Sequence, residues 1–232
     1  MTQTRPTPFA RLAARLLVAL TRLVTGVRAH GPGAAELAAA VVPQRVYFAN
    51  HTSHLDALVI WSTLPPAQRA RTRPVAAQDY WDRPGFRRWL AVAVLDALCI
   101  PRGAQAARDA LHRLDEALGA GDSLILFPEG TRGDGEGLAT LKPGLYHVAE
   151  RHPGVDLVPV HLENLSRILP KGEVLPVPLI GRALFGHAIR LVPGEGREAF
   201  LSRARDCLLA LRAQCAGAGG GEGQQRGAAP CP

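Results

Sequence analysis

The segment SLILF, residues 123–127, places four large apolar residues in a row without the alternation of a half-buried strand. A strand of this kind is buried on both faces, which is typical of a parallel sheet covered by helices. Further short strand-like segments alternate with helical ones along the chain, among them RVYFAN (45–50), DLVPVHLE (156–163) and HAIRLVPG (187–194). This order predicts an α/β fold with a largely parallel or mixed sheet flanked by helices.

Composition divides the chain into three parts. With 232 residues and 47% hydrophobic content it can bury one sizeable core, so we expect a single main domain at residues 31–215. Residues 1–30 form an amphipathic helical arm in this prediction. Residues 216–232 are dominated by Gly, Ala, Gln and Pro without periodicity, which is typical of a disordered tail.

The N-terminal arm is strongly basic. Residues 1–35 contain five arginines and no acidic residue, so they carry five of the seven excess positive charges. At about 100° per residue, Arg11, Arg15 and Arg22 fall within roughly 40° of one another, opposite the large apolar side chains. This pattern favours a helix lying in a membrane interface, with its arginines toward anionic phosphates and its leucines in the acyl boundary. A helix packed on its own domain's core is the alternative.

The sequence also bears on partners and location. The arm's apolar run LLVAL is too short to cross a bilayer, and the four cysteines show no CxxC spacing. No aromatic stacking platform or helix-turn-helix pattern marks a nucleic-acid partner, so a basic binding module without enzymatic activity is disfavoured. We therefore expect a peripheral or monotopic protein at the cytoplasmic face of a membrane, with the anionic membrane surface as its partner.

The heptapeptide NHTSHLD, residues 50–56, follows a buried strand and could hold a metal. His51, His54 and Asp56 are all metal-ligand types, as in a metal-dependent hydrolase. However, the HxHxDH motif of metallo-β-lactamase-like hydrolases ends in a histidine where this chain has Ala57. The spacing therefore disfavours a metal site.

Two other interpretations of NHTSHLD remain. If His51 ends the strand and Asp56 begins a helix capped by Thr52 or Ser53, the two side chains can meet. The carboxylate would then fix the imidazole tautomer, as in a general base. Alternatively, the heptapeptide is a plain polar turn in which Asp56 and Ser53 only cap the helix.

A long glycine-rich loop, PEGTRGDGEGLATLK at 128–142, follows the SLILF strand. It lacks the G-K-[ST] sequence of a P-loop. Its Arg132 and Lys142, with Arg102 after the preceding strand, would place three cations at the sheet edge where α/β proteins bind ligands. Arginine can grip a phosphate with two hydrogen bonds, and lysine adds a point charge.

Together these segments resemble the motifs of the glycerolipid acyltransferase family, which includes 1-acylglycerol-3-phosphate acyltransferases. NHTSHLD is similar to the family's NHxxxxD motif, and FPEGTR at 127–132 resembles its third motif. CIPRG at 99–103 and VPV at 158–160 are looser matches to its second and fourth motifs. The similar region runs from about Asn50 to Asn164.

The resemblance implies transfer of a fatty acyl group from acyl-CoA or acyl carrier protein to the free hydroxyl of a lysophospholipid. The expected acceptor is 1-acylglycerol-3-phosphate, giving phosphatidic acid, with another lyso-lipid such as lyso-ornithine lipid as the alternative. It implies His51 as general base and Asp56 as the group that orients it, without a metal, a cofactor or a role for His54. The implied glycerophosphate-binding residues are Arg102, Glu129, Gly130, Thr131, Arg132 and Lys142.

Overall fold

The computed structural model describes residues 7–38, 43–78, 85–101, 103, 106–133, 135, 137–168 and 180–218. In chain order the elements are α1 (Pro8–Thr25), β1 (Ala29–His30), the 3₁₀ helix η1 (Pro32–Ala38), β2 (Arg45–Ala49), α2 (Asp56–Thr63), α3 (Pro66–Arg69), β3 (Thr72–Ala77), α5 (Phe86–Trp89), the π-helical turn η2 (Leu90–Val94), β4 (Leu98–Ile100), α6 (Ala107–Gly119), β5 (Ser123–Leu126), α7 (Gly144–Arg151), β6 (Asp156–Glu163), α8 (Leu165–Ile168), β7 (Arg182–Phe185) and α9 (Arg197–Ala218).

The described strands form one seven-stranded sheet in the order β1-β7-β6-β2-β5-β3-β4. Neighbouring strands are parallel except β6 and β7, which run antiparallel. The predicted α/β fold is therefore confirmed, with a mixed sheet flanked by helices. As the SLILF pattern predicts, β5 lies inside the sheet, between β2 and β3.

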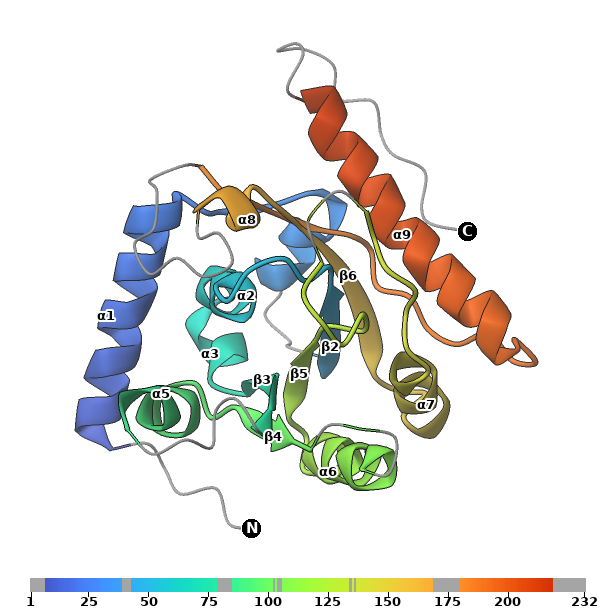
Figure 1. Ribbon diagram of the computed structural model, residues 1–232, viewed down its shortest axis with the longest axis horizontal. Helices are drawn as coiled ribbons and strands as arrows, with labels where there is room; N and C mark the ends of the chain where they lie inside the picture. The colour runs from blue at the N-terminus through green and yellow to red at the C-terminus, as the bar shows by residue number, and fades with distance from the viewer. Residues whose placement is uncertain are drawn as a thin grey trace.

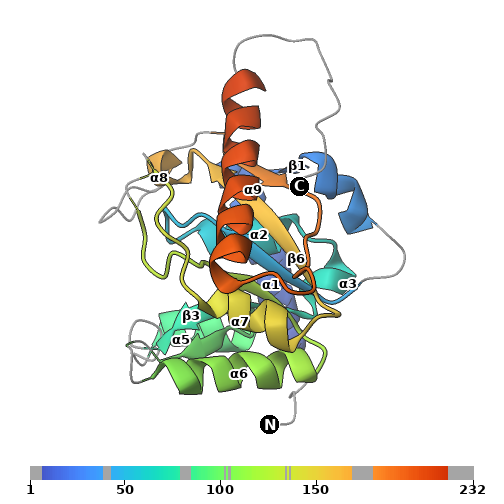
Figure 2. The ribbon, with the colours of Figure 1, turned by 90° about the vertical axis from the view of Figure 1, so that its right-hand side faces the viewer.

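Helices cover both faces of this sheet. Every residue of β2 is buried, and its side chains divide between two apolar clusters. Tyr47 and Ala49 face the cluster that contains α1 and α2, whereas Val46 and Phe48 face the one formed with α6, α7 and α9. Figures 1 and 2 show α1 and α2 on one side of the sheet and α7 and α9 on the other. The result is a three-layer arrangement that leaves the strand ends for the polar loops.

Helix α1 uses two of its faces in different ways. Its small residues Ala10, Thr21 and Thr25 are buried, and Arg22 donates two hydrogen bonds to the carbonyl oxygen of Ser62 at the end of α2. Five large apolar side chains instead point outward and are 54% to 82% exposed: Phe9, Leu12, Leu16, Leu20 and Leu23. The helix therefore packs on the domain, as the alternative interpretation held, while its leucine face stays uncovered among the described residues.

Two segments differ from the sequence-based expectation. Residues 187–194 form no strand: the ladder with β6 ends at Phe185, and only Ile189 pairs again, in an isolated bridge to Leu157. The gap lies opposite Pro159, which accepts a hydrogen bond from Gly186 but has no N–H to return. At the C-terminus, α9 extends to Ala218, three residues into the expected tail, and the remainder of that tail lies outside the described residues.

Candidate active site

The register of the sheet brings the two polar motifs level with each other. Strands β2 and β5 are parallel neighbours in which Phe48 pairs with Leu126. His51 lies three residues beyond Phe48, and Glu129 lies three residues beyond Leu126. NHTSHLD and FPEGTR therefore leave the same edge of the sheet side by side, at the carboxyl ends of the strands.

His51 and Asp56 form a hydrogen-bonded pair. Nδ1 of His51 lies 2.8 Å from Oδ2 of Asp56, although a straight helix would turn their side chains about 140° apart. The distance arises because His51 lies in the loop and Asp56 is the first residue of α2. When Nδ1 carries the proton, the carboxylate accepts this hydrogen bond and Nε2 is able to accept a proton. This is the geometry of a general base and its orienting acid.

The Asp56 carboxylate also organises the turn. Besides His51, its Oδ2 accepts hydrogen bonds from the backbone amides of Thr52 at 2.6 Å and Ser53 at 2.8 Å. Its side chain is fully buried, and its place in the first turn of α2 puts the charge where the helix dipole favours an anion. The expectation that Thr52 or Ser53 caps α2 through its side chain is wrong, because α2 has no side-chain cap. The carboxylate satisfies the loop amides instead.

Glu129 ties the two motifs together. Its buried carboxylate accepts a hydrogen bond from the His51 amide at 2.8 Å through Oε1 and from the Ala139 amide at 3.0 Å through Oε2. The amide of Gly133 donates in turn to the His51 carbonyl oxygen at 2.8 Å. The backbone of His51 is thus held on both sides by the FPEGTR loop.

The other expected phosphate ligands follow Glu129. Gly130 has a φ of 73°, a left-handed conformation that suits glycine, and the side chain of Lys142 lies where a Cβ at this position would be. Thr131 and Lys142 are exposed, whereas Arg132 is half-buried. The structure therefore places Lys142 against the glycine of this turn. Arg102 lies outside the described residues.

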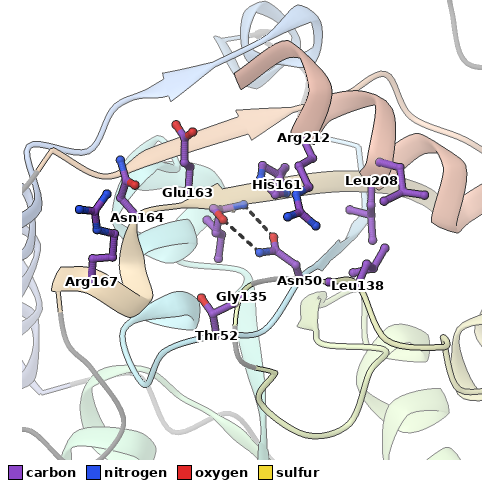
Figure 3. A pocket seen from close by; sticks show the side chains of 13 residues that line it. Asn50, Thr52, Gly135, Leu138, His161, Glu163, Asn164, Arg167, Leu208 and Arg212 are labelled. Atoms are coloured by element: carbon purple, nitrogen blue, oxygen red, sulfur yellow. Dashed lines mark hydrogen bonds between the residues drawn. The ribbon is translucent and has the colours of Figure 1, made fainter. Parts of the chain in front are cut away.

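Two side chains in the site were given no role from the sequence. Asn50 accepts a hydrogen bond from the Leu162 amide at 2.8 Å and donates to the Leu162 carbonyl at 3.0 Å, which fixes the turn to β6 (Figure 3). The Phe127 ring stacks on the His51 ring with their centroids 4.2 Å apart. Both belong to the quoted motifs, but their partners depend on which strands are neighbours in the sheet.

The metal interpretation finds no support in the geometry. Within the described residues, no group of three His, Cys, Asp or Glu side chains is arranged to hold a metal ion. His54, the third ligand that this interpretation needs, is exposed, whereas Asp56 is buried. The two histidines of the turn are therefore not equivalent.

A family model described as Acyltransferase matches residues 36–163, which is more than half of the chain and includes both motifs. The chain belongs to the acyltransferase family. The likeness to glycerolipid acyltransferases drawn from NHxxxxD and FPEGTR is therefore confirmed at the level of the family. The match also includes β2, α2 and β5, the elements that position His51 and Asp56.

Two named relatives are similar to parts of this chain. A chloroplastic 1-acyl-sn-glycerol-3-phosphate acyltransferase of Arabidopsis thaliana, LPAT1, is 41% identical over 65 residues, which cover 28% of this chain and 18% of that protein. A lyso-ornithine lipid O-acyltransferase of Pseudomonas aeruginosa is 32% identical over 151 residues, which cover 65% of this chain and 54% of that protein. The chain thus spans no more than about half the length of these two relatives.

The fold is also that of a solved structure. The 1-acyl-sn-glycerophosphate acyltransferase PlsC of Thermotoga maritima superposes with a TM-score of 0.66, covering 89% of this chain and 81% of that one. The sequences are 17% identical, so the likeness concerns the fold alone.

Proposed function

We propose that this protein transfers a fatty acyl group from the thioester of acyl-CoA or acyl carrier protein to the free hydroxyl of a lyso-lipid. The observation that carries the proposal is the 2.8 Å contact between His51 Nδ1 and Asp56 Oδ2, at a strand end inside the matched family region. The two relatives are named for acylation of 1-acyl-sn-glycerol-3-phosphate and of lyso-ornithine lipid, which supports a lyso-lipid acceptor.

In the proposed mechanism, His51 acts as a general base. Its Nε2 takes the proton of the acceptor hydroxyl while that oxygen attacks the thioester carbonyl carbon. The tetrahedral intermediate then collapses, the C–S bond breaks, and the imidazolium returns the proton to the departing thiolate. The products are an ester and a free thiol, and Asp56 stabilises the transient imidazolium throughout.

The developing oxyanion needs hydrogen-bond donors that do not already donate to another group of the protein. The amides of His51, Thr52, Ser53, Gly130 and Gly133 all donate within the chain. The amides of Thr131 and Arg132 make no hydrogen bond with the part of the chain that the structure describes. We assign the oxyanion to these two amides, because preorganised donors contribute strongly to acyl transfer.

Cations beside the turn support an acidic acceptor. Arg132 and Lys142 come from the loop that supports His51, and we propose that they contact a phosphate on the acceptor together with Arg102. The Glu129 carboxylate is occupied by two amides and is buried, so its contribution is to hold the turn rather than to touch an anion. Gly130 allows the turn that presents Thr131 and Arg132.

The outward face of α1 supports binding to a membrane surface, and we propose that this is the cytoplasmic side. No helix in the described part of the chain is long and apolar enough to cross a bilayer. A face of five exposed large apolar side chains, with the exposed Arg11 and Arg15 on another side of the helix, fits a helix lying in the interface of an anionic membrane. Such docking would bring the site to its lipid substrates.

A panel of donors and acceptors tests the proposal. Purified full-length protein is incubated with acyl-CoA or acylated carrier protein and with 1-acylglycerol-3-phosphate, lyso-ornithine lipid or another lyso-lipid, and acylated product is measured by mass spectrometry. We expect product with at least one pair, and none above background with the His51→Ala variant. Absence of product with every pair, or equal product from the variant, would contradict the proposal.

A further inference from the structure

A pocket of about 270 Å³ lies beside the catalytic turn and has no role in the chemistry described so far. It is lined by Asn50 and Thr52, the two neighbours of His51, but not by His51 itself. Its other walls come from Gly135, Gly137 and Leu138, from the C-terminal end of β6 with the residues that follow it, and from helix α9 (Figure 3). A group bound here would be attached to the reacting hydroxyl through several bonds.

Charges of both signs are spaced along this pocket. Arg212 reaches from α9 toward Asn50 and His161, whereas Glu163, Asn164 and Arg167 gather at the other end (Figure 3). The carboxylate of Glu163 also lies 3.8 Å from Arg182. A ligand with a single compact charge would contact the charged side chains at only one end of this pocket.

His161 adds no charge to the end that holds Arg212. Burial, followed by the positive charge of Arg212, lowers the pKa of His161 to about 4. The imidazole is therefore neutral near pH 7, and an anion at this end of the pocket would be bound by the guanidinium of Arg212. Arginine binds carboxylates through paired hydrogen bonds.

The remaining walls are apolar and the volume is modest. Leu138, Leu208 and Leu209 also line the pocket, and Figure 3 shows Leu138 and Leu208 at its Arg212 end. Its volume of about 270 Å³ lies just below the range for pockets that hold drug-sized ligands, which begins at about 300 Å³. It therefore suits a headgroup with a short methylene chain rather than a nucleotide-bearing donor such as coenzyme A.

We propose that this pocket holds the amino-acid headgroup of a lyso-lipid acceptor, with Arg212 binding its carboxylate and Glu163 its ammonium group. The inference rests on the proposed acyl transfer and specifies its acceptor class. In 1-acylglycerol-3-phosphate the phosphate is joined to the reacting carbon by one short link and suits Arg132 and Lys142. In lyso-ornithine lipid the carboxylate is about two bonds further from the hydroxyl, and the amine is further still. This greater distance from the hydroxyl suits the charged side chains of the pocket, Arg212 and Glu163, rather than Arg132 and Lys142.

The test compares two acceptors in one set of variants. Purified wild-type, Arg212→Gln and Glu163→Gln proteins are assayed for kcat/KM with lyso-ornithine lipid and with 1-acylglycerol-3-phosphate, using the same acyl-CoA donor. Arg197→Gln is the matched control, since Arg197 is an exposed arginine on the same helix and does not line the pocket. Thermal melting checks that each variant is folded.

We expect Arg212→Gln to lower the ratio of kcat/KM for lyso-ornithine lipid to that for 1-acylglycerol-3-phosphate by about tenfold or more, because a hydrogen bond to a charged group is lost. Glu163→Gln should lower the ratio in the same direction, and Arg197→Gln should leave it unchanged. An unchanged ratio in folded Arg212→Gln, or a wild-type protein that acylates only 1-acylglycerol-3-phosphate, would overturn the pocket assignment but leave the proposed function standing. Wild-type protein that acylates neither acceptor would also overturn the pocket assignment, whereas the proposed function is contradicted only if no pair of the full donor and acceptor panel gives product.

Discussion

The backbone amide of His51 donates a hydrogen bond to the carboxylate of Glu129 at 2.8 Å. This bond links the loop after β2 to the loop after β5 and leaves the His51 ring to interact with Asp56 and Phe127. The second oxygen of Glu129 accepts from Ala139, so one buried side chain sets the distance between the two motifs.

Glu129→Gln tests this linking role. One carboxylate oxygen would become an NH₂ group facing a backbone N–H, so a bond is replaced by two opposed donors. We expect the free energy of unfolding to fall by about 1–3 kcal/mol. We also expect kcat to fall more than the KM for the acceptor changes, because the residue acts through His51. Chemical denaturation and steady-state kinetics measure the two effects, and a rise in acceptor KM with unchanged kcat would instead indicate direct substrate binding.

Gly130→Ala tests the backbone of the same loop. The φ of 73° at this position costs an L-residue about 1–2 kcal/mol, whether or not the Lys142 side chain moves aside. We expect lower stability and lower kcat, because the turn carries the amides of Thr131 and Arg132. Gly137→Ala, in the same loop but with open space around its Cβ position, is the matched control. Equal melting temperatures for the two variants would argue against strain at residue 130.

Much of this arrangement was accessible from the sequence. The family resemblance favoured the pairing of His51 with Asp56, which the spacing in the heptapeptide alone left open. The apolar strands and the helix that begins near Asp56 follow from local patterns. The bonds from Glu129 to His51 and from Asn50 to Leu162 do not, because they depend on β2 lying between β5 and β6. Strand order is a property of the whole sheet, and no local pattern encodes it.

Helix α1 also has features that its sequence pattern did not predict. Periodicity placed the arginines and the large apolar residues of this helix on different sides. It did not distinguish the small residues that pack on the domain, such as Ala10 and Thr21, from the exposed leucines. The buried Thr21 satisfies its hydroxyl within the helix, by donating a hydrogen bond to the Leu17 carbonyl oxygen. Small buried residues carry a weak sequence signal.

The exposed face of α1 makes a prediction for membrane binding. Replacing Leu16 and Leu20 by glutamate removes two apolar side chains and adds two negative charges on a face that is already open to solvent. We expect vesicle partitioning to fall at least about tenfold, since burying one leucine stabilises by about 1.5–3 kcal/mol. Sedimentation with anionic vesicles measures this.

Val192→Glu is the control for that experiment, because Val192 is an exposed apolar residue outside α1. The melting temperature of the double variant should stay close to that of wild type, as neither leucine is buried. Unchanged vesicle binding by the folded double variant would exclude this face as the membrane contact.

His161 makes the stability of the protein depend on pH. Its pKa is lowered from 6.5 to about 4 in the folded state, so between these values the unfolded chain takes up a proton that the folded chain does not. The resulting contribution to the free energy of unfolding is about 3 kcal/mol. It is fully present above pH 6.5 and is lost as the pH falls toward 4. Urea unfolding at several pH values gives the free energy of unfolding as a function of pH. In this pH window it should change less steeply for His161→Gln than for wild type. The exposed His112→Gln should retain the wild-type slope.

Asp56→Asn tests the orientation of the imidazole. The amide keeps the shape of the carboxylate, but it cannot stabilise the imidazolium and offers an NH₂ group in place of an acceptor. We expect kcat to fall by about 10²–10⁴ with little change in acceptor KM. The substitution also removes the charge that receives the amides of Thr52 and Ser53, so circular dichroism and melting must accompany the kinetics.

The rate of acyl transfer by His51→Gln, compared with that of His54→Gln, tests the central claim most directly. Both variants replace a histidine of the same turn by a neutral side chain, but His51 contacts Asp56 and Phe127, whereas His54 is exposed. With a purified acyl-CoA donor and the best lyso-lipid acceptor, we predict that His51→Gln loses at least about a hundredfold in kcat while His54→Gln stays within about threefold of wild type. Near-normal transfer by folded His51→Gln, or an equal loss in both variants, would contradict the assignment of His51 as the general base.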